Sequence, residues 1–127
     1  MIPIHDGRGR IVGFGGRVLP GVAKPGAGKY VNSPASEIFD KGSTLFNLHR
    51  ARAVFAAPQE ASGWRGTRRL VVVEGYMDAI AGHRCGLAMV APMGTALTEM
   101  QIERLWRVDQ CPLLLFDGDD AGRKAAV

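Results

Sequence analysis

Two short acidic motifs hold the residue types best suited to chemistry. Glu74 and Asp78 lie in the sequence Glu-Gly-Tyr-Met-Asp, and Asp117 and Asp119 flank a glycine in Asp-Gly-Asp. Magnesium prefers hard oxygen ligands and commonly takes one or two protein carboxylates together with substrate phosphates. Ions held in this way activate a hydroxyl nucleophile and stabilise a leaving oxygen. We therefore predict that Glu74, Asp117 and Asp119 bind Mg²⁺, with Mn²⁺ as a substitute, beside nucleic-acid phosphates.

Each acidic motif also has a simpler interpretation. An Asp-Gly-Asp sequence on its own is typical of a solvated turn, since short motifs have many false positives. Glu74 can serve as a general acid or base instead of a metal ligand. An EF-hand calcium loop is excluded, because Ala121 stands where that loop needs an oxygen ligand.

Both motifs directly follow apolar runs that indicate buried strands. Residues 70–73 precede Glu74, residues 113–116 precede Asp117, and a third run covers residues 87–91. Short continuous apolar runs are typical of strands in parallel sheets, which are covered on both faces. Because ligands bind at the carboxyl ends of such strands, the position of the acids strengthens the prediction of one converging site.

Helices are predicted between these strands. Residues 78–85 form the first, which Gly86 ends, and residues 99–108 form the second, which Thr98 caps. Another helix is expected to start at Arg123. The resulting β-α-β-α-β order predicts an α/β fold with an open parallel sheet between helices.

The first half of the chain has a different character. Residues 11–19 predict a strand interrupted by glycines, residues 20–28 a loop, residues 45–55 a helix and residues 58–69 a polar connection. Basic residues dominate up to residue 36, where one acid, Asp6, accompanies five bases. These bases are Arg8, Arg10, Arg17, Lys24 and Lys29. This distribution favours a polyanionic partner, with a solvated basic loop as the alternative.

Bulk composition limits the class of protein. The chain has 127 residues, the length of one ordinary domain, and a net charge of +4. It contains no apolar run of the length that spans a membrane and no signal-peptide pattern at its start. We therefore expect a cytoplasmic protein without a membrane partner.

Other residues that could do chemistry show no functional spacing. Cys85 and Cys111 are predicted to be buried or indifferent thiols, because they are too far apart for a zinc site. The three histidines show no ligand pattern. Trp106 is predicted to pack on the apolar face of its helix.

The two acidic motifs, in residues 73–78 and 116–123, resemble the TOPRIM domain of bacterial DnaG-type DNA primases. The sequence Gly-Phe-Gly-Gly-Arg at 13–17 and the segments 29–34 and 92–98 are similar to the same catalytic core. The resemblance implies a Rossmann-like parallel sheet flanked by helices, preceded by a smaller mixed α+β segment. It places the division at residues 1–66, a basic segment facing nucleotide and template, and 67–127, the TOPRIM domain truncated at its C-terminus.

The resemblance also implies an activity and roles for individual residues. The activity is template-directed synthesis of short RNA primers by magnesium-dependent nucleotidyl transfer, a DNA-directed RNA polymerase reaction. Glu74, Asp117 and Asp119 match catalytic metal ligands, and Asp78 matches an acid that supports catalysis. The residues that match nucleic-acid or nucleotide contacts are Arg10, Arg17, Lys29, Tyr30, Asn32 and Lys41. Tyr30 can stack on a base or pack in the core.

The implied partners are a single-stranded DNA template, ribonucleoside triphosphates, the RNA primer and a replicative helicase. Helicase and zinc would bind through domains that these residues do not include. Because the sequence stops before the third acidic motif of such primases, we expect weak magnesium and nucleotide binding without efficient catalysis by these residues alone. Two alternatives remain: a TOPRIM-type nuclease and a non-catalytic nucleotide-binding module.

Overall fold

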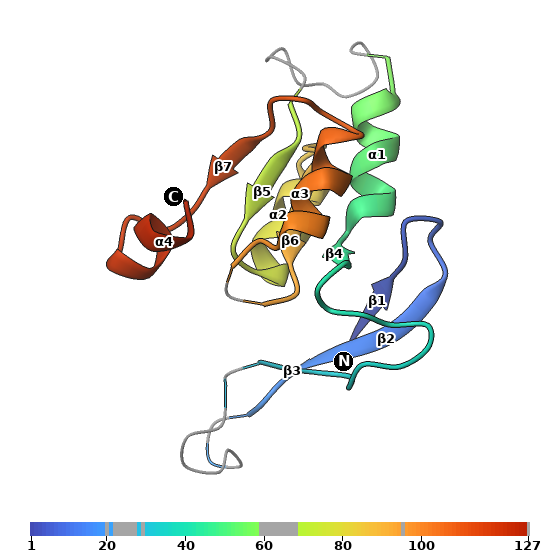
Figure 1. The fold of residues 1–127 in the computed structure, drawn as a ribbon, viewed down its shortest axis with the longest axis vertical. Helices are drawn as coiled ribbons and strands as arrows, with labels where there is room; N and C mark the ends of the chain where they lie inside the picture. Colours follow the sequence, from blue (N-terminus) through green and yellow to red (C-terminus); the bar gives the residue numbers. More distant parts are fainter. Residues whose placement is uncertain (20, 22–27, 29, 59–68, 95, 127) are drawn as a thin grey trace.

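A computed structural model describes residues 1–19, 21, 28, 30–58, 69–94 and 96–126. These residues form two sheets, which Figure 1 shows one below the other. The predicted loop at 20–28 and the connection at 58–69 lie largely outside the described residues. Among the described helices, none has the length and apolar character needed to cross a membrane.

The first sheet is small and antiparallel, with the strand order β1-β2-β3. Its strands are β1 (Ile2–His5), β2 (Ile11–Arg17) and β3 (Tyr30–Asn32). The predicted glycine-interrupted strand is confirmed as β2. Within it, Gly13 pairs with Ile4 of β1, and Gly15 pairs with Ile2 of β1 and with Asn32 of β3.

The second sheet has the order β4-β6-β5-β7. Its strands are β4 (Leu45–Phe46), β5 (Val71–Val73), β6 (Met89–Pro92) and β7 (Leu113–Leu115). Strand β5 runs parallel to both β6 and β7, whereas β4 is antiparallel to β6. The predicted parallel α/β sheet is therefore confirmed. Strand β4 belongs to this sheet although it precedes residue 67, and the division of the chain at that residue stays a prediction.

The helices follow the predicted alternation with shifted ends. They are α1 (Leu48–Ala56), α2 (Tyr76–Arg84), α3 (Glu99–Trp106) and α4 (Asp120–Ala125). Thr98 caps α3 as predicted, and Gly86 has the positive φ expected after α2. Helix α1 begins later than residue 45 because Leu45 and Phe46 pair with β6 instead. Helix α4 begins before Arg123 because the Asp119 carboxylate caps it.

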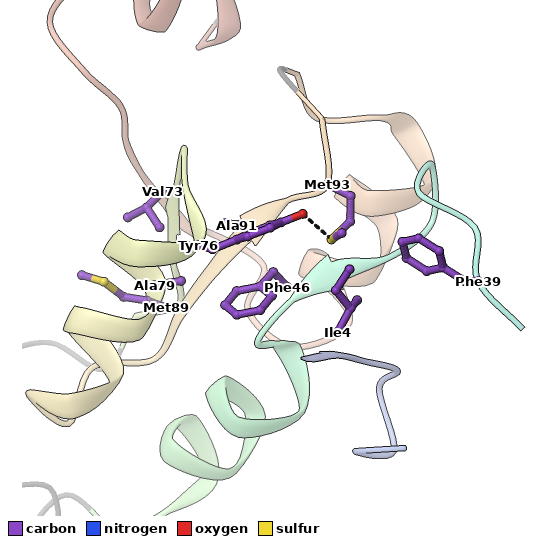
Figure 2. Close-up of a cluster of buried hydrophobic side chains, with 9 residues drawn as sticks. All are labelled: Ile4, Phe39, Phe46, Val73, Tyr76, Ala79, Met89, Ala91 and Met93. Carbon is purple, nitrogen blue, oxygen red and sulfur yellow. Dashed lines mark hydrogen bonds between the residues drawn. The ribbon is translucent and has the colours of Figure 1, made fainter. Parts of the chain in front are cut away.

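Each face of the second sheet carries its own apolar cluster. Val72 and Val90, both fully buried, pack with residues of α1 and α3 such as Leu48 and Leu105. The other face packs against α2 and the small sheet, and Figure 2 shows its nine buried side chains. In Figure 1, α3 lies in front of the sheet and α2 behind it. The alternation of side chains along β5 thus separates two layers of helix.

Two expectations about burial were wrong. All three leucines of β7 are exposed, because β7 is the edge strand of the sheet and no described element covers it as α1 and α2 cover β5. Trp106 is 57% exposed at the last turn of α3, since Gln101 and Leu105 are the residues of that helix turned into the protein. Of the two options left open for Cys85 and Cys111, burial is excluded because both are exposed free thiols.

Candidate active site

The ends of β5 and β7 bring the two acidic loops together. The register pairs Val73 with Leu115, so the residues that follow each strand emerge at one edge of the sheet. The backbone N–H of Asp117 donates to Oε1 of Glu74 over 2.8 Å. The structure therefore places Glu74 and Asp117 side by side, and the carboxylate of the first loop holds the backbone of the second.

The second acidic loop turns directly into α4. Oδ1 of Asp119 accepts a hydrogen bond of 2.8 Å from the backbone N–H of Gly122, which makes Asp119 the N-cap of that helix. A Cβ atom at Gly122 would overlap the carbonyl oxygen of Asp117 and would lie 2.7 Å from Oε1 of Glu74. Glycine is therefore required at residue 122 for the two loops to approach.

An acidic cavity of about 390 Å³ opens at this edge. Glu74, Asp78 and Asp117 line it, and all three side chains are exposed. Its apolar lining includes Val73 and Met89. Within residues 1–19, 30–58, 69–94 and 96–126, no three His, Cys, Asp or Glu side chains are grouped closely enough to hold a metal ion. The role of these carboxylates as ligands stays a prediction.

Glu74 also lines a second cavity, of about 260 Å³. Its lining includes Tyr30 and Asn32 of the small sheet. It also includes Tyr76, the first residue of α2, and Met93, which directly follows β6. The hydroxyl of Tyr76 donates to Oδ1 of Asn32 over 2.7 Å, and Nδ2 of Asn32 donates to the carbonyl oxygen of Met93 over 3.2 Å. Glu74 thus borders one acidic cavity and one aromatic and amide-lined cavity.

Tyr76 joins the two sheets. Only 7% of it is exposed, and Figure 2 shows its ring within the buried cluster, near Phe46 and Met93. Burial raises the pKa of the Tyr76 hydroxyl, while the bond to Asn32 acts in the opposite direction. The hydroxyl therefore remains a donor at neutral pH. A Cβ atom at Gly15 would lie 2.9 Å from Cε2 of Tyr76, so the close approach of β2 also requires glycine.

Arg17 and Tyr30 form a cross-strand pair at the end of β2 and β3. The guanidinium carbon of Arg17 lies 5.9 Å from the centroid of the Tyr30 ring, within the range of a cation–π contact. The Tyr30 ring also meets Tyr76 edge-on, at 6.0 Å between centroids. With 37% of Tyr30 exposed, its ring is not a buried core group.

Arg10 lies apart from this pair. It sits in the β1–β2 turn, where its guanidinium approaches Oδ2 of Asp6 to 2.7 Å. The backbone N–H of Arg10 is the main group that lowers the pKa of Asp6 to about 2. The structure therefore does not bring Arg10 together with Arg17, Tyr30 and Asn32. Lys29 lies outside the described residues.

Lys41 is exposed in the turn that leads into β4. The side-chain amide of Gln101, in α3, donates to the carbonyl oxygens of Lys41 and Thr44. Neither Gln101 nor the bond between Tyr76 and Asn32 was predicted from the sequence. A usable signal existed for Gln101, because Thr-x-x-Gln before a helical pattern is a capping box. No local pattern connects residues 32 and 76.

Two family models match the chain, one in each half. The model of the DNA primase catalytic core, N-terminal domain, matches residues 1–52. The model of the Toprim domain matches residues 68–127. The acidic loops around Glu74 and Asp117 both lie in the second match, and the pair Arg17 and Tyr30 lies in the first.

Curated relatives match along nearly the whole chain. The DNA primase of Pseudomonas putida is 49% identical over 127 residues, which are 99% of this chain and 17% of that protein. The DNA primase of Escherichia coli K12 is 45% identical, again over 99% of this chain and over 20% of that protein. The chain therefore spans about a fifth of the length of these relatives.

Solved primase structures share the fold. The zinc-binding and RNA polymerase domains of the Aquifex aeolicus primase superpose with a TM-score of 0.79 and 41% identity, over 98% of this chain and 28% of that one. A DnaG primase catalytic domain bound to single-stranded DNA gives a TM-score of 0.76 and 43% identity, over 98% of this chain and 35% of that one. With the two family models, these similarities show that the chain belongs to the DnaG-type DNA primases, as part of their catalytic core with a Toprim domain.

Proposed function

We propose that the protein containing this chain is a DNA primase that joins ribonucleotides on a DNA template by metal-dependent nucleotidyl transfer. The observation that carries the proposal is the position of Glu74 between two cavities. One is bordered by Asp78 and Asp117, and the other by Tyr30 and Asn32. A nucleotidyl transferase needs this arrangement, with hard oxygen ligands on one side of the reacting phosphate and groups that hold the nucleotide on the other.

The carboxylates fit a divalent cation by their chemistry. The bonds within the two loops use Oε1 of Glu74 and Oδ1 of Asp119, so the second oxygen of each carboxylate is the one that we assign to a metal ion. Asp117 adds a carboxylate beside Glu74. A bound Mg²⁺ or Mn²⁺ would supply charge neutralisation of the triphosphate and activation of the primer's 3′-hydroxyl. We assign to Asp78 a supporting role, since it borders the same cavity.

The small sheet supplies the groups that we assign to nucleotide and template. The guanidinium of Arg17 pairs with phosphate, and the half-exposed ring of Tyr30 offers a stacking surface for a base. Asn32 offers its amide at the wall of the second cavity. We assign phosphate contacts to Lys29 and Lys41, and a peripheral contact with nucleic acid to Arg10.

We base the proposed ligands and partners of the reaction on the same family. A related DnaG catalytic domain has been solved with single-stranded DNA, which supports a single-stranded template here. We propose ribonucleoside triphosphates and the growing RNA primer as the other ligands, and a replicative helicase as the partner at the fork. Any zinc would belong to a separate domain, as in the Aquifex aeolicus protein, whose zinc-binding domain is distinct from its RNA polymerase domain. We place the reaction in the cytoplasm.

The test is primer synthesis by the complete protein on single-stranded DNA with magnesium or manganese. Glu74→Gln and Asp117→Asn should each reduce the rate by at least about 100-fold, because ligands that stabilise transition-state charge contribute on this scale. Glu99→Gln is the matched control, since Glu99 is an exposed acid on α3 outside both cavities. Synthesis that survives Glu74→Gln unchanged contradicts the proposal.

Two other outcomes would identify the alternatives. Metal-dependent cleavage of DNA without any synthesis by the wild type would indicate a Toprim-type nuclease. Intact activity in Glu74→Gln, combined with loss of nucleotide binding in Lys29→Ala, would indicate a non-catalytic nucleotide-binding module. Each outcome excludes primer synthesis at Glu74.

A further inference from the structure

Gln101 carries a polar amide and is buried, with 1% of the residue exposed. It occupies the first turn of α3 and completes a capping box with Thr98. Its Oε1 accepts from the backbone N–H of Thr98 over 3.1 Å, and its own backbone N–H donates to Oγ1 of Thr98 over 3.2 Å. The cap therefore uses only the carbonyl oxygen of the side-chain amide.

The amide nitrogen of Gln101 has a separate task. Nε2 donates to the carbonyl oxygen of Lys41 over 3.0 Å and to that of Thr44 over 2.8 Å. The hydroxyl of Thr98 donates to the carbonyl oxygen of Gly42, which lies between them. Three carbonyl groups of residues 41–44, named here the Lys41 turn, are thus bound by two side chains at the start of α3.

The choice of glutamine over glutamate at this position supports a purpose beyond capping. Glutamate serves a capping box equally well, and its charge is favourable at a helix N-terminus. A carboxylate, however, has no N–H to donate. Glutamate cannot make the two bonds from Gln101 to the Lys41 turn. These bonds, and not the capping box, therefore explain why glutamine occupies this position.

The other end of the Lys41 turn is fixed by Asp40. The backbone N–H of Gly42 donates to Oδ1 of Asp40 over 3.1 Å. The backbone N–H and the hydroxyl of Thr44 both donate to the carbonyl oxygen of Asp40, over 3.0 and 2.6 Å. The backbone on both sides of Lys41 is therefore held, while its side chain is exposed. Such a turn presents one lysine from a fixed base.

We propose that Gln101 is a positioning residue for nucleotide binding, which fixes the Lys41 turn so that the Lys41 ammonium meets a phosphate of the incoming nucleoside triphosphate. The inference rests on the proposed function, which assigns Lys41 to phosphate. Gln101 itself is buried and does not touch the nucleotide. Its effect should therefore appear only through Lys41.

The experiment measures primer synthesis by the complete protein as a function of ribonucleoside triphosphate concentration and of salt. Gln101→Glu keeps the capping box and removes both bonds to the Lys41 turn. We expect the KM for nucleotide to rise about tenfold with kcat little changed, the pattern of lost ground-state binding. The dependence of KM on salt should also weaken, because the phosphate contact that salt screens is impaired. Gln101→Met, which adds no charge, should act in the same direction.

A matched control separates positioning from stability. Asn47 is another buried amide, 6% exposed, whose Nδ2 donates to the carbonyl oxygen of Met89 over 2.9 Å. Asn47→Asp removes a buried donor as Gln101→Glu does, and it should lower thermal stability without changing the salt dependence of KM. An equal change of KM in Asn47→Asp would show a general effect of destabilisation and overturn the proposal.

The decisive comparison adds Lys41→Ala to each Gln101 variant. If Gln101 acts through Lys41, Gln101→Glu should cause no further rise of KM once Lys41 is alanine. A further tenfold rise overturns the inference while leaving the assignment of Lys41 intact. If Lys41→Ala alone leaves KM unchanged, the assignment of Lys41 is wrong and the inference falls with it, and Glu74→Gln still reports independently on the proposed reaction.

Discussion

The two acidic loops end neighbouring strands of one sheet, but the strands support them differently. Glu74 follows β5, in which Val72 and Val73 are 0% and 3% exposed. Asp117 follows β7, in which Leu113, Leu114 and Leu115 are 52%, 46% and 60% exposed. The first loop is thus fixed by an apolar core on both faces of its strand, and the second leaves an edge strand that contributes little burial.

The bonds around the loops follow the same division. The first loop leads into α2, where Tyr76 is buried and bonded to Asn32 of the small sheet. The second loop is held by the bond from Asp117 to Glu74 and by the cap that Asp119 makes on its own helix. Glu74 therefore has two tasks, one toward the proposed metal ion and one as the anchor of the second loop.

The largest effect should come from breaking the contact between the loops. In Gly122→Ala, the new methyl group meets the carbonyl oxygen of Asp117 and Oε1 of Glu74. We expect primer synthesis to fall about 100-fold, since displacements of about 1 Å at a reacting centre cost this much. Gly118→Ala is the matched control, because no atom lies within 4 Å of the position that its methyl group would take. Equal rates for the two variants would show that the loops do not depend on each other.

Burial on the two strands can be compared directly by truncation. Val72→Ala should lower the free energy of unfolding by about 2 kcal/mol, from the lost apolar burial and the cavity left behind. Leu114→Ala removes a larger group but should cost below about 0.5 kcal/mol, as is usual for exposed sites. Urea unfolding of the protein and of each variant measures both changes in the free energy of unfolding. A larger loss in Leu114→Ala would mean that β7 is covered in solution.

The elements that were predicted correctly depend on local patterns. Thr98 and Gly86 are capping residues whose chemistry acts within one helical turn, and the valines of β5 are β-branched as buried strands require. The parallel sheet followed from the alternation of such elements. The edge position of β7 did not follow, because an apolar run is the same whether or not another element covers it.

The site was predictable to the extent that strand ends converge. The fold rule brought Glu74 and Asp117 to one edge, where the structure also has them. The cap of Asp119 on α4 was missed although it is a local bond to Gly122, since aspartate before a helix is a common N-cap. The fold rule could not show that Tyr76 bonds a residue 44 positions earlier. The bond from Tyr76 to Asn32 depends on how α2 packs against the small sheet, and residue spacing carries no information about that packing.

Removing the bond between α2 and the small sheet should have an intermediate effect. Tyr76→Phe keeps the ring in its cluster and deletes the hydroxyl that Asn32 accepts. We expect a loss of about 1 kcal/mol in stability, the usual contribution of one hydrogen bond, and a rise of KM for nucleotide. The measurements are thermal unfolding and primer synthesis. If Tyr76→Phe has the same effect in an Asn32→Ala background, the bond does not couple the first loop to the small sheet.

The smallest effect should be a change in acid sensitivity, located away from both acidic loops. His49, in the first turn of α1, packs against His5 of β1 with 4.5 Å between ring centroids. Burial lowers the pKa of His49 below 6.5, and the charges of His5, Arg50 and His83 act in the same direction against Asp6. Below pH 6.5 the unfolded chain therefore binds more protons at this residue than the folded one, so stability decreases as the pH falls through the folded pKa.

His49→Gln removes this titration and should flatten the decrease of melting temperature between about pH 7 and pH 5, the range around an ordinary histidine pKa. Arg52→Gln is the control, because Arg52 is exposed on the same helix, stays charged throughout this range and is not among the charges that act on His49. If the melting temperature of His49→Gln falls with pH as steeply as that of the wild type, the acid sensitivity comes from other residues. A flattened slope would show that acid weakens the junction of β1 and α1, where the rings of His5 and His49 meet, and that this loss of stability does not depend on the acidic loops.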